Sequence, residues 1–102
     1  MMHPVLSLIS LAMKSHHLVS GEFQTLEALH TGKASLVIVA NDASENTKKK
    51  FSDKTKFRQV PLVCFEDKEQ LGHAIGQKER AVLGITDQGF SEAILKKLKK
   101  SE

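Results

Sequence analysis

The stretch Ser35-Leu36-Val37-Ile38-Val39-Ala40 is an unbroken apolar run rich in β-branched residues. A strand with one wet face alternates apolar and polar residues, so an unbroken run is typical of a strand covered on both faces. This run predicts a sheet with helices on either side. Two similar runs follow at residues 60–65 and 81–86, and a shorter candidate strand precedes it at 17–20.

Helical patterns alternate with these runs. The first begins at Pro4 and repeats apolar residues along one face as far as His16. The third begins at Asp42-Ala-Ser-Glu45, which has the spacing of a capping box, and the fourth begins at a similar sequence, Asp67-Lys-Glu-Gln70. The second covers about 22–31, the third ends near 57, the fourth stops at 76, and the fifth covers 90–98 before a lysine tail.

This order of elements, α-β-α-β-α-β-α-β-α, predicts an α/β fold. We expect a three-layer α/β/α sandwich with helices on both faces of a mixed, mainly parallel sheet of about four strands. The 102 residues suit one domain, which we expect to span residues 1–102. Apolar residues make up 40% and charged residues 26%, so the composition is that of a globular domain rather than a disordered chain.

Composition also bounds the setting of the protein. No apolar run approaches the length of a membrane span, and the chain lacks the pattern of a signal peptide. A single cysteine cannot form an internal disulfide, which suits a reducing compartment. We therefore expect a cytoplasmic protein without a membrane partner. Cys64 lies within an apolar run, which predicts a buried structural thiol.

The sequence offers little for catalysis. The five histidines lie on different predicted elements, and the chain lacks Cys/His metal spacing, a phosphate loop, a dinucleotide fingerprint and a nucleophile motif. We expect no enzymatic activity, no cofactor and no metal.

The turn Gly21-Glu22-Phe23-Gln24-Thr25 is the main candidate for a binding site. A helix that starts directly after a glycine has backbone N–H groups without intrahelical partners, and its dipole favours an anion there. This turn and the turn after Gly76 both connect sheet and helix layers, so both could lie on one rim. Four cations could converge on that rim, although the first two could equally be solvent-facing ends of a helix and a loop. They are Lys14, Lys33, Lys78 and Arg80.

Basic residues are also concentrated in the window 48–58. The window has a local charge of +5, and the lysine tail at 96–100 forms a second cluster, within a net charge of +3. Such clusters attract polyanions, but they also serve to keep a helix face solvated. The two interpretations stay open at this point.

Several stretches resemble a family of small ribosomal RNA-binding proteins, which includes the large-subunit proteins called L-seven-Ae and L-thirty-e. Lys68-Glu-Gln-Leu-Gly-His-Ala-Ile-Gly76 is similar to the family segment K-x-x-L-G-x-A-x-G. The spacing from Gly21 to Gly32 matches the RNA-binding turn and helix, and residues 36–43 look like the family stretch VIIAEDA. Residues 42–51 and 85–90 are closest to the bacterial YlxQ-type branch. The resemblance covers nearly the whole chain.

This resemblance implies a function. Such proteins bind kink-turn RNA, a sharply bent duplex with tandem sheared G·A pairs. The segment corresponding to residues 21–27 docks at the G·A pairs, and the loop 77–80 covers a flipped-out nucleotide. The implied protein is a non-enzymatic, ribosome-associated monomer that binds structured RNA, with ribosomal proteins as candidate partners. The predicted RNA-binding residues are Lys14, Gly21, Glu22, Phe23, Gln24, Lys33, Asn41, Lys78 and Arg80.

The turn that begins at Gly21 departs from the family pattern G-x-N-E-x-x-K. The four specified positions of that pattern are occupied here by Gly21, Phe23, Gln24 and Glu27. Losing one good polar base contact costs about 1–3 kcal/mol, and Glu27 should repel phosphate. Phe23 could instead stack on a base, or it could close the apolar edge of its own helix beside Leu26.

Two other functions therefore remain beside kink-turn recognition. One is a protein-interaction adaptor that kept the fold and lost the RNA contacts. The other is nonspecific polyanion binding by the basic helix.

Overall fold

A computed structural model of the chain describes residues 3–100, apart from the side chain of the last of these. Five helices and four strands alternate along this part of the chain, as the sequence predicts. They are α1 (Pro4–Lys14), β1 (Leu18–Ser20), α2 (Glu22–His30), β2 (Leu36–Val39), α3 (Glu45–Arg58), β3 (Leu62–Cys64), α4 (Lys68–Ala74), β4 (Val82–Ile85) and α5 (Gln88–Lys100).

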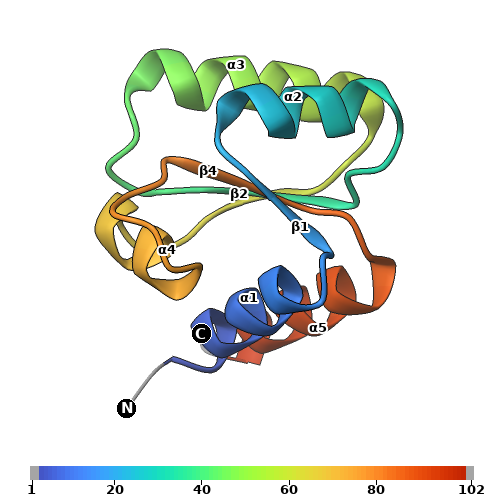
Figure 1. Cartoon of the computed structure of the whole chain (residues 1–102). Helices are drawn as coiled ribbons and strands as arrows, with labels where there is room; N and C mark the ends of the chain where they lie inside the picture. The colour runs from blue at the N-terminus through green and yellow to red at the C-terminus, as the bar shows by residue number, and fades with distance from the viewer. Residues whose placement is uncertain (1–2, 101–102) are drawn as a thin grey trace.

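The sheet lies between two helical layers, and this confirms the three-layer prediction. In Figure 1, α2 and α3 cover one face of the sheet, while α1, α4 and α5 lie against the other. Every residue of β2 is fully buried, because this strand is covered on both faces and has a neighbour on each side. Among the described residues, no helix is both long and apolar enough to cross a membrane.

The sheet has the strand order β1-β4-β2-β3 and is mixed, as predicted. It is not mainly parallel, however, since β2 and β3 form the one parallel pair, and β4 is antiparallel to both β1 and β2. The reason is the short α4. Its seven residues span about 10 Å, so the chain stays at the rim where β3 ends and enters β4 from that side.

Two local predictions fail for physical reasons. Helix α3 is capped by Ser44, whose Oγ accepts from Thr47 N at 3.1 Å, while Asp42 Oδ1 accepts from Lys68 N at 2.9 Å. Asp42 lies in the turn before the helix, so the helix begins two residues later than the sequence predicts and Ser44 is its N-cap. The Cys64 thiol is exposed rather than buried, because β3 is an edge strand. The cap predicted for α4 is confirmed, with Asp67 accepting from the N–H three residues on.

The short strands separate two rims of the sheet, each lined by loops. The Gly21 rim comprises residues 21–24, 41–42, 66–68 and 77–81. Three backbone hydrogen bonds join these segments to one another or to the adjacent strand ends: Gly21 N to Val82 O, Ala40 N to Ala81 O, and Asn41 N to Glu66 O. The Lys33 rim comprises residues 14–17, 32–35, 59–61 and 86–88 and is joined in the same way at the opposite strand ends. Strands of three or four residues place the two rims about 10–13 Å apart.

Candidate functional site

The Gly21 turn leaves the start of α2 open. Gly21 has φ +90°, which side chains rarely allow, and its own N–H is bonded to Val82 O at 2.9 Å. The glycine N–H is therefore not available to a ligand, contrary to our expectation from the sequence. The next amides are different: within residues 3–100, the N–H groups of Phe23 and Gln24 have no partner.

The other helices close this position with a side chain. Residues before α1, α3, α4 and α5 accept hydrogen bonds from the first turn, whereas Gly21 has no side chain to do so. These residues are His3, Ser44, Asp67 and Asp87.

Arg80 connects this turn to the loop before β4. Its Nε donates to Ser20 Oγ at 2.8 Å and its Nη1 donates to Glu79 O at 2.8 Å. This contact confirms that the turns at Gly21 and after Gly76 lie on one rim. The remaining guanidinium N–H groups have no partner among the described residues, so a cation sits beside the open start of α2.

The loop 77–80 is held by a close approach to α4. Gln77 N donates to Gly72 O at 2.8 Å, and Arg80 N donates to Lys68 O at 3.0 Å. A Cβ on Gly72 would lie 2.5 Å from Glu79 Cα, so only glycine admits the loop at this distance. The close contact at Gly72 therefore joins α4 to the loop 77–80.

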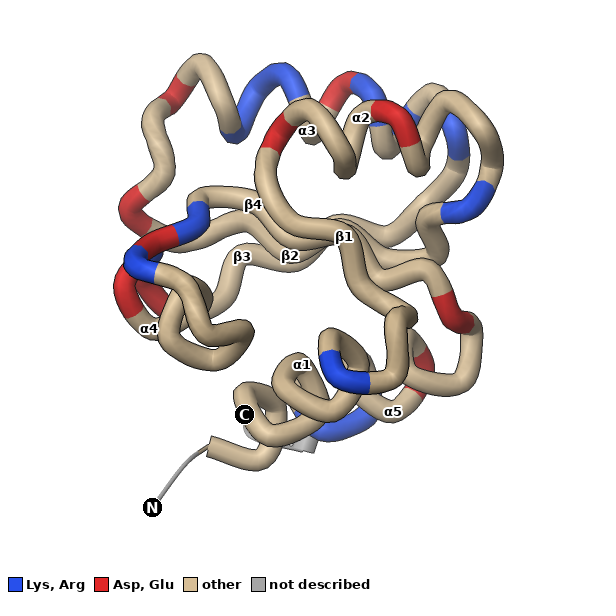
Figure 2. The backbone as a smooth tube through the Cα atoms, viewed as in Figure 1, with Lys and Arg blue, Asp and Glu red and all other residues tan. Residues whose placement is uncertain are grey.

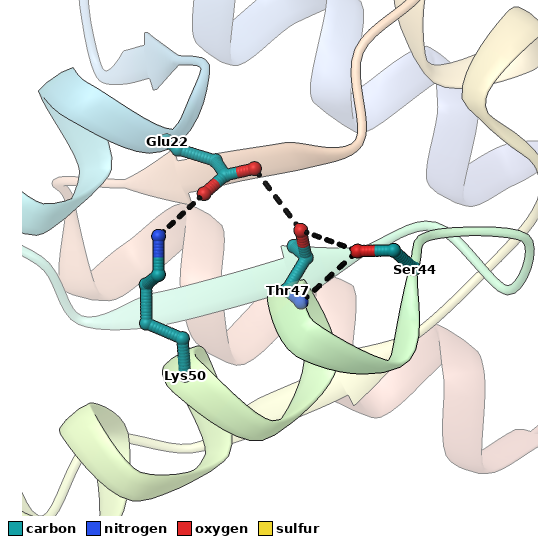
Figure 3. A network of polar contacts seen from close by, with 4 residues as sticks. All are labelled: Glu22, Ser44, Thr47 and Lys50. Carbon is teal, nitrogen blue, oxygen red and sulfur yellow. Dashed lines mark hydrogen bonds and ion pairs between the residues drawn. The ribbon is translucent and has the colours of Figure 1, made fainter.

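Glu22 braces the turn against α3, as Figure 3 shows. Its carboxylate accepts from Lys50 Nζ at 3.0 Å and from Thr47 Oγ1 at 3.1 Å, and Ser44 Oγ in turn donates to Thr47 Oγ1. The hydrogen bond from Lys50 lowers the pKa of Glu22 below its ordinary value, although partial burial acts in the opposite direction. The carboxylate is thus occupied within the protein, and its charge is balanced beside the turn.

The next two side chains of the turn face solvent. Phe23 is 79% exposed, and Gln24 is also exposed. Phe23 therefore does not close the apolar edge of α2, which was one of the two interpretations of this residue. Glu27 is exposed and lines a groove of about 250 Å³ together with Gln24 and Lys33, on the side of α2 that faces β1.

The structure does not bring all the predicted cations together. Lys78 and Arg80 lie on the Gly21 rim, and the exposed Asn41 lies there at the end of β2. Lys14 and Lys33 lie on the Lys33 rim, since the residues after each lead into β1 and β2 at their starting ends. The predicted convergence is wrong for these two lysines. Every other predicted RNA-binding residue lies on the Gly21 rim.

Charge on the Gly21 rim is mixed. Figure 2 shows basic and acidic segments alternating around α4 and in the loop before β4. The rim therefore offers individually placed hydrogen-bond donors rather than a uniformly positive field. Within residues 3–100, no three His, Cys, Asp or Glu side chains are grouped closely enough to hold a metal ion.

The sequence matches the Ribosomal protein L7Ae/L30e/S12e/Gadd45 family over residues 4–95. The chain belongs to this family. It is 46% identical over 89 residues to the RNA-binding protein YlxQ of Enterococcus faecium, covering 85% of this chain and 84% of that protein. It is 38% identical over 88 residues to the RNA-binding protein YlxQ of Bacillus subtilis, covering 86% and 88% respectively. These relatives confirm the resemblance to the YlxQ-type branch.

Solved structures show the same fold. A protein of unknown function from Bacillus halodurans superposes with a TM-score of 0.93 at 38% identity, covering 96% of this chain and 99% of that one. The Giardia lamblia 15.5kD RNA binding protein superposes with a TM-score of 0.77 at 23% identity, covering 93% and 82%. The second likeness establishes the architecture alone.

Proposed function

We propose that this chain is a non-enzymatic RNA-binding protein of the cytoplasm. It acts as a monomer on kink-turn or similarly bent RNA within a ribonucleoprotein, with the ribosome as its setting. The observation that carries this proposal is the Arg80–Ser20 contact, which joins the open start of α2 to the loop 77–80 on one rim. The family of the chain, and the RNA-binding names of its YlxQ relatives, support the same function.

Each part of the Gly21 rim has a role in this proposal. The N–H groups of Phe23 and Gln24 donate to phosphate or to base edges at the G·A pairs. The Gln24 amide reads a base edge, and the Phe23 ring stacks on a base. Arg80 uses its unpaired donors on the RNA backbone, while Lys78 and Asn41 extend the contact. The loop 77–80 covers the nucleotide that the bend pushes out.

Because the charge of the rim is mixed, we expect the protein to distinguish RNAs by the shape of the duplex rather than by its charge alone. A straight duplex offers its phosphates to any cation, but A-form RNA keeps its deep groove closed to side chains. A bent duplex opens that groove, and a rim with two fixed elements can enter it. The proposal therefore predicts a preference for bent RNA rather than merely for RNA.

A titration tests this preference. Fluorescently labelled kink-turn RNA and an unbent duplex of equal length and composition are compared at one salt concentration by anisotropy. We expect at least tenfold tighter binding of the kink-turn, and we expect Arg80→Ala to reduce that ratio. Lys14→Ala is the matched control, since this lysine lies on the opposite rim and does not line the groove beside Gln24. Equal affinity for the two RNAs would refute kink-turn recognition.

The exposure of Phe23 favours a second candidate function, that of a protein-interaction adaptor. A ring that is 79% exposed near two glutamates suits an apolar partner surface as well as a base. The same titration separates these functions. Unchanged RNA affinity in Phe23→Ala, combined with loss of a protein partner in cells, would favour the adaptor.

A further inference from the structure

The end of α3 carries an aromatic ring that the Gly21 rim does not use. Phe57 is 80% exposed, and the guanidinium carbon of Arg58 lies over its ring at 5.5 Å from the centroid. Within residues 3–100, the other exposed large apolar side chains are Leu11 and Phe23. A ring paired with a guanidinium is a typical platform for a nucleobase, because both groups stack on flat π surfaces.

Phe57 belongs to a basic stripe along one flank of α3. Lys50, Lys54, Phe57 and Arg58 follow each other at i, i+4, i+7 and i+8, which places them on one side of the helix. This side faces α2, because Lys50 contacts Glu22 at its start. The stripe therefore begins beside the turn at residues 21–25 and runs to the Lys33 rim, about 10 Å further along the helix.

The cations of this stripe beyond Lys50 are free to meet an anion. Within the described residues, no carboxylate lies within ion-pair distance of Lys54 or Arg58. The basic segments along α3 can be followed in Figure 2. Solubility alone would account for the charges, and the exposed phenylalanine adds a flat aromatic face to this basic stripe.

We propose that Lys54, Phe57 and Arg58 form a second RNA-binding site, which stacks an unpaired base of the strand that leaves the bent RNA. This inference rests on the proposed function, since the RNA held at the Gly21 rim supplies the strand. Lys54 and Arg58 neutralise its phosphates, and the free face of Phe57 takes one base without regard to its identity. RNA suits this surface better than a protein does, because the cations beside the ring are unpaired.

The experiment compares kink-turn RNAs with blunt ends and with a six-nucleotide single-stranded uridine extension on the 5′ or the 3′ strand. Affinity is measured by anisotropy, and a 2-aminopurine in the extension reports stacking. We expect one extension to tighten binding by about tenfold in the unaltered protein. Phe57→Ala should remove that gain and the fluorescence change, with blunt kink-turn affinity unchanged. Lys54→Ala with Arg58→Ala should make the salt dependence shallower for the extended RNA only.

Two controls make the result decisive. Leu11→Ala also removes an exposed apolar side chain, but on the opposite helical layer, and should preserve the gain. An abasic extension supplies phosphates without bases and should give little of it. The inference is overturned if neither extension tightens binding, or if the gain survives Phe57→Ala. If the blunt kink-turn itself is not preferred over straight duplex, the proposed function fails, and an oligouridine alone still tests the Phe57 site in the same way.

Discussion

Replacing Gly72 by alanine should displace the loop 77–80 more than it destabilises the fold. The added Cβ would lie 2.5 Å from Glu79 Cα and 2.7 Å from Lys78 O, where a carbon contact normally needs about 3.5–4 Å. Both partners are backbone atoms, so the loop must retreat by about 1 Å. That movement is enough to break the 2.8 Å bond between Arg80 and Ser20.

The effect on stability should be small because two terms oppose each other. Overpacking costs about 1–3 kcal/mol, while exchanging glycine for alanine within a helix recovers about 1 kcal/mol. The net loss of about 0–2 kcal/mol lowers Tm by no more than roughly 15 °C in a domain of this size. The affinity for kink-turn RNA should fall by at least tenfold at a temperature where the variant is fully folded, because the loop 77–80 is no longer fixed beside the Gly21 turn.

The assay pairs calorimetry with an RNA titration of the same samples. Gly89→Ala is the matched control, since this glycine also lies in a helix, but its added Cβ would meet only the Asp87 side chain, at 3.1 Å. It should bind kink-turn RNA as the unaltered protein does. If Gly72→Ala is folded and binds equally well, the position of the loop does not determine recognition, and our reasoning about this rim is wrong.

Other substitutions test the remaining contacts. Arg80→Ala should reduce the salt dependence of RNA binding by about one phosphate contact, whereas Lys14→Ala on the opposite rim should leave it unchanged, as binding measured at several salt concentrations will show. Phe23→Ala should weaken RNA binding about tenfold without lowering Tm, because the ring is already exposed; an unchanged affinity would exclude stacking. Glu22→Gln should reduce stability by less than about 1 kcal/mol, since the ion pair with Lys50 is half exposed. The hydrogen bond from Lys50 lowers the pKa of Glu22, so this contribution is present above pH ~5 and is lost as the pH falls through the lowered pKa. Denaturant unfolding of the two proteins, measured over a series of decreasing pH values, should therefore converge once this carboxylate is protonated in the folded protein.

The fold could be predicted from the sequence where local patterns determine structure. The run at residues 35–40 predicted a strand covered on both faces, and the glycines at 21, 32 and 76 end or begin elements as expected. Strand order is not local. The exposed Cys64 was misplaced because an edge strand and a central strand can share the same apolar run. The mainly parallel sheet was wrong because the short α4 does not carry the chain back across the sheet.

The site was predictable only in part, for the same reason. The sequence singled out the turn at Gly21 and the loop after Gly76 because a glycine marks the element boundary at each, and the resemblance to the family implied that both contact RNA. It could not separate Arg80 from Lys33, because only strand direction decides which rim a loop joins. The ion pair between Glu22 and Lys50 links residues 28 positions apart, and neither periodicity nor a motif predicts such a pair.

The two departures from the family pattern affect different parts of recognition. At position 23, the side chain changes but the backbone N–H does not, so the donor at the start of α2 survives and only the base-edge contact of an amide is lost. At position 27, a carboxylate lines the groove on the β1 side of α2, which disfavours a phosphate chain along that side. The other side of α2 faces Lys54 and Arg58, which have no acidic partner among the described residues. Glu27 and the α3 stripe therefore favour the same outcome: RNA that docks at the Gly21 rim should continue over α3 rather than over the edge strand β1.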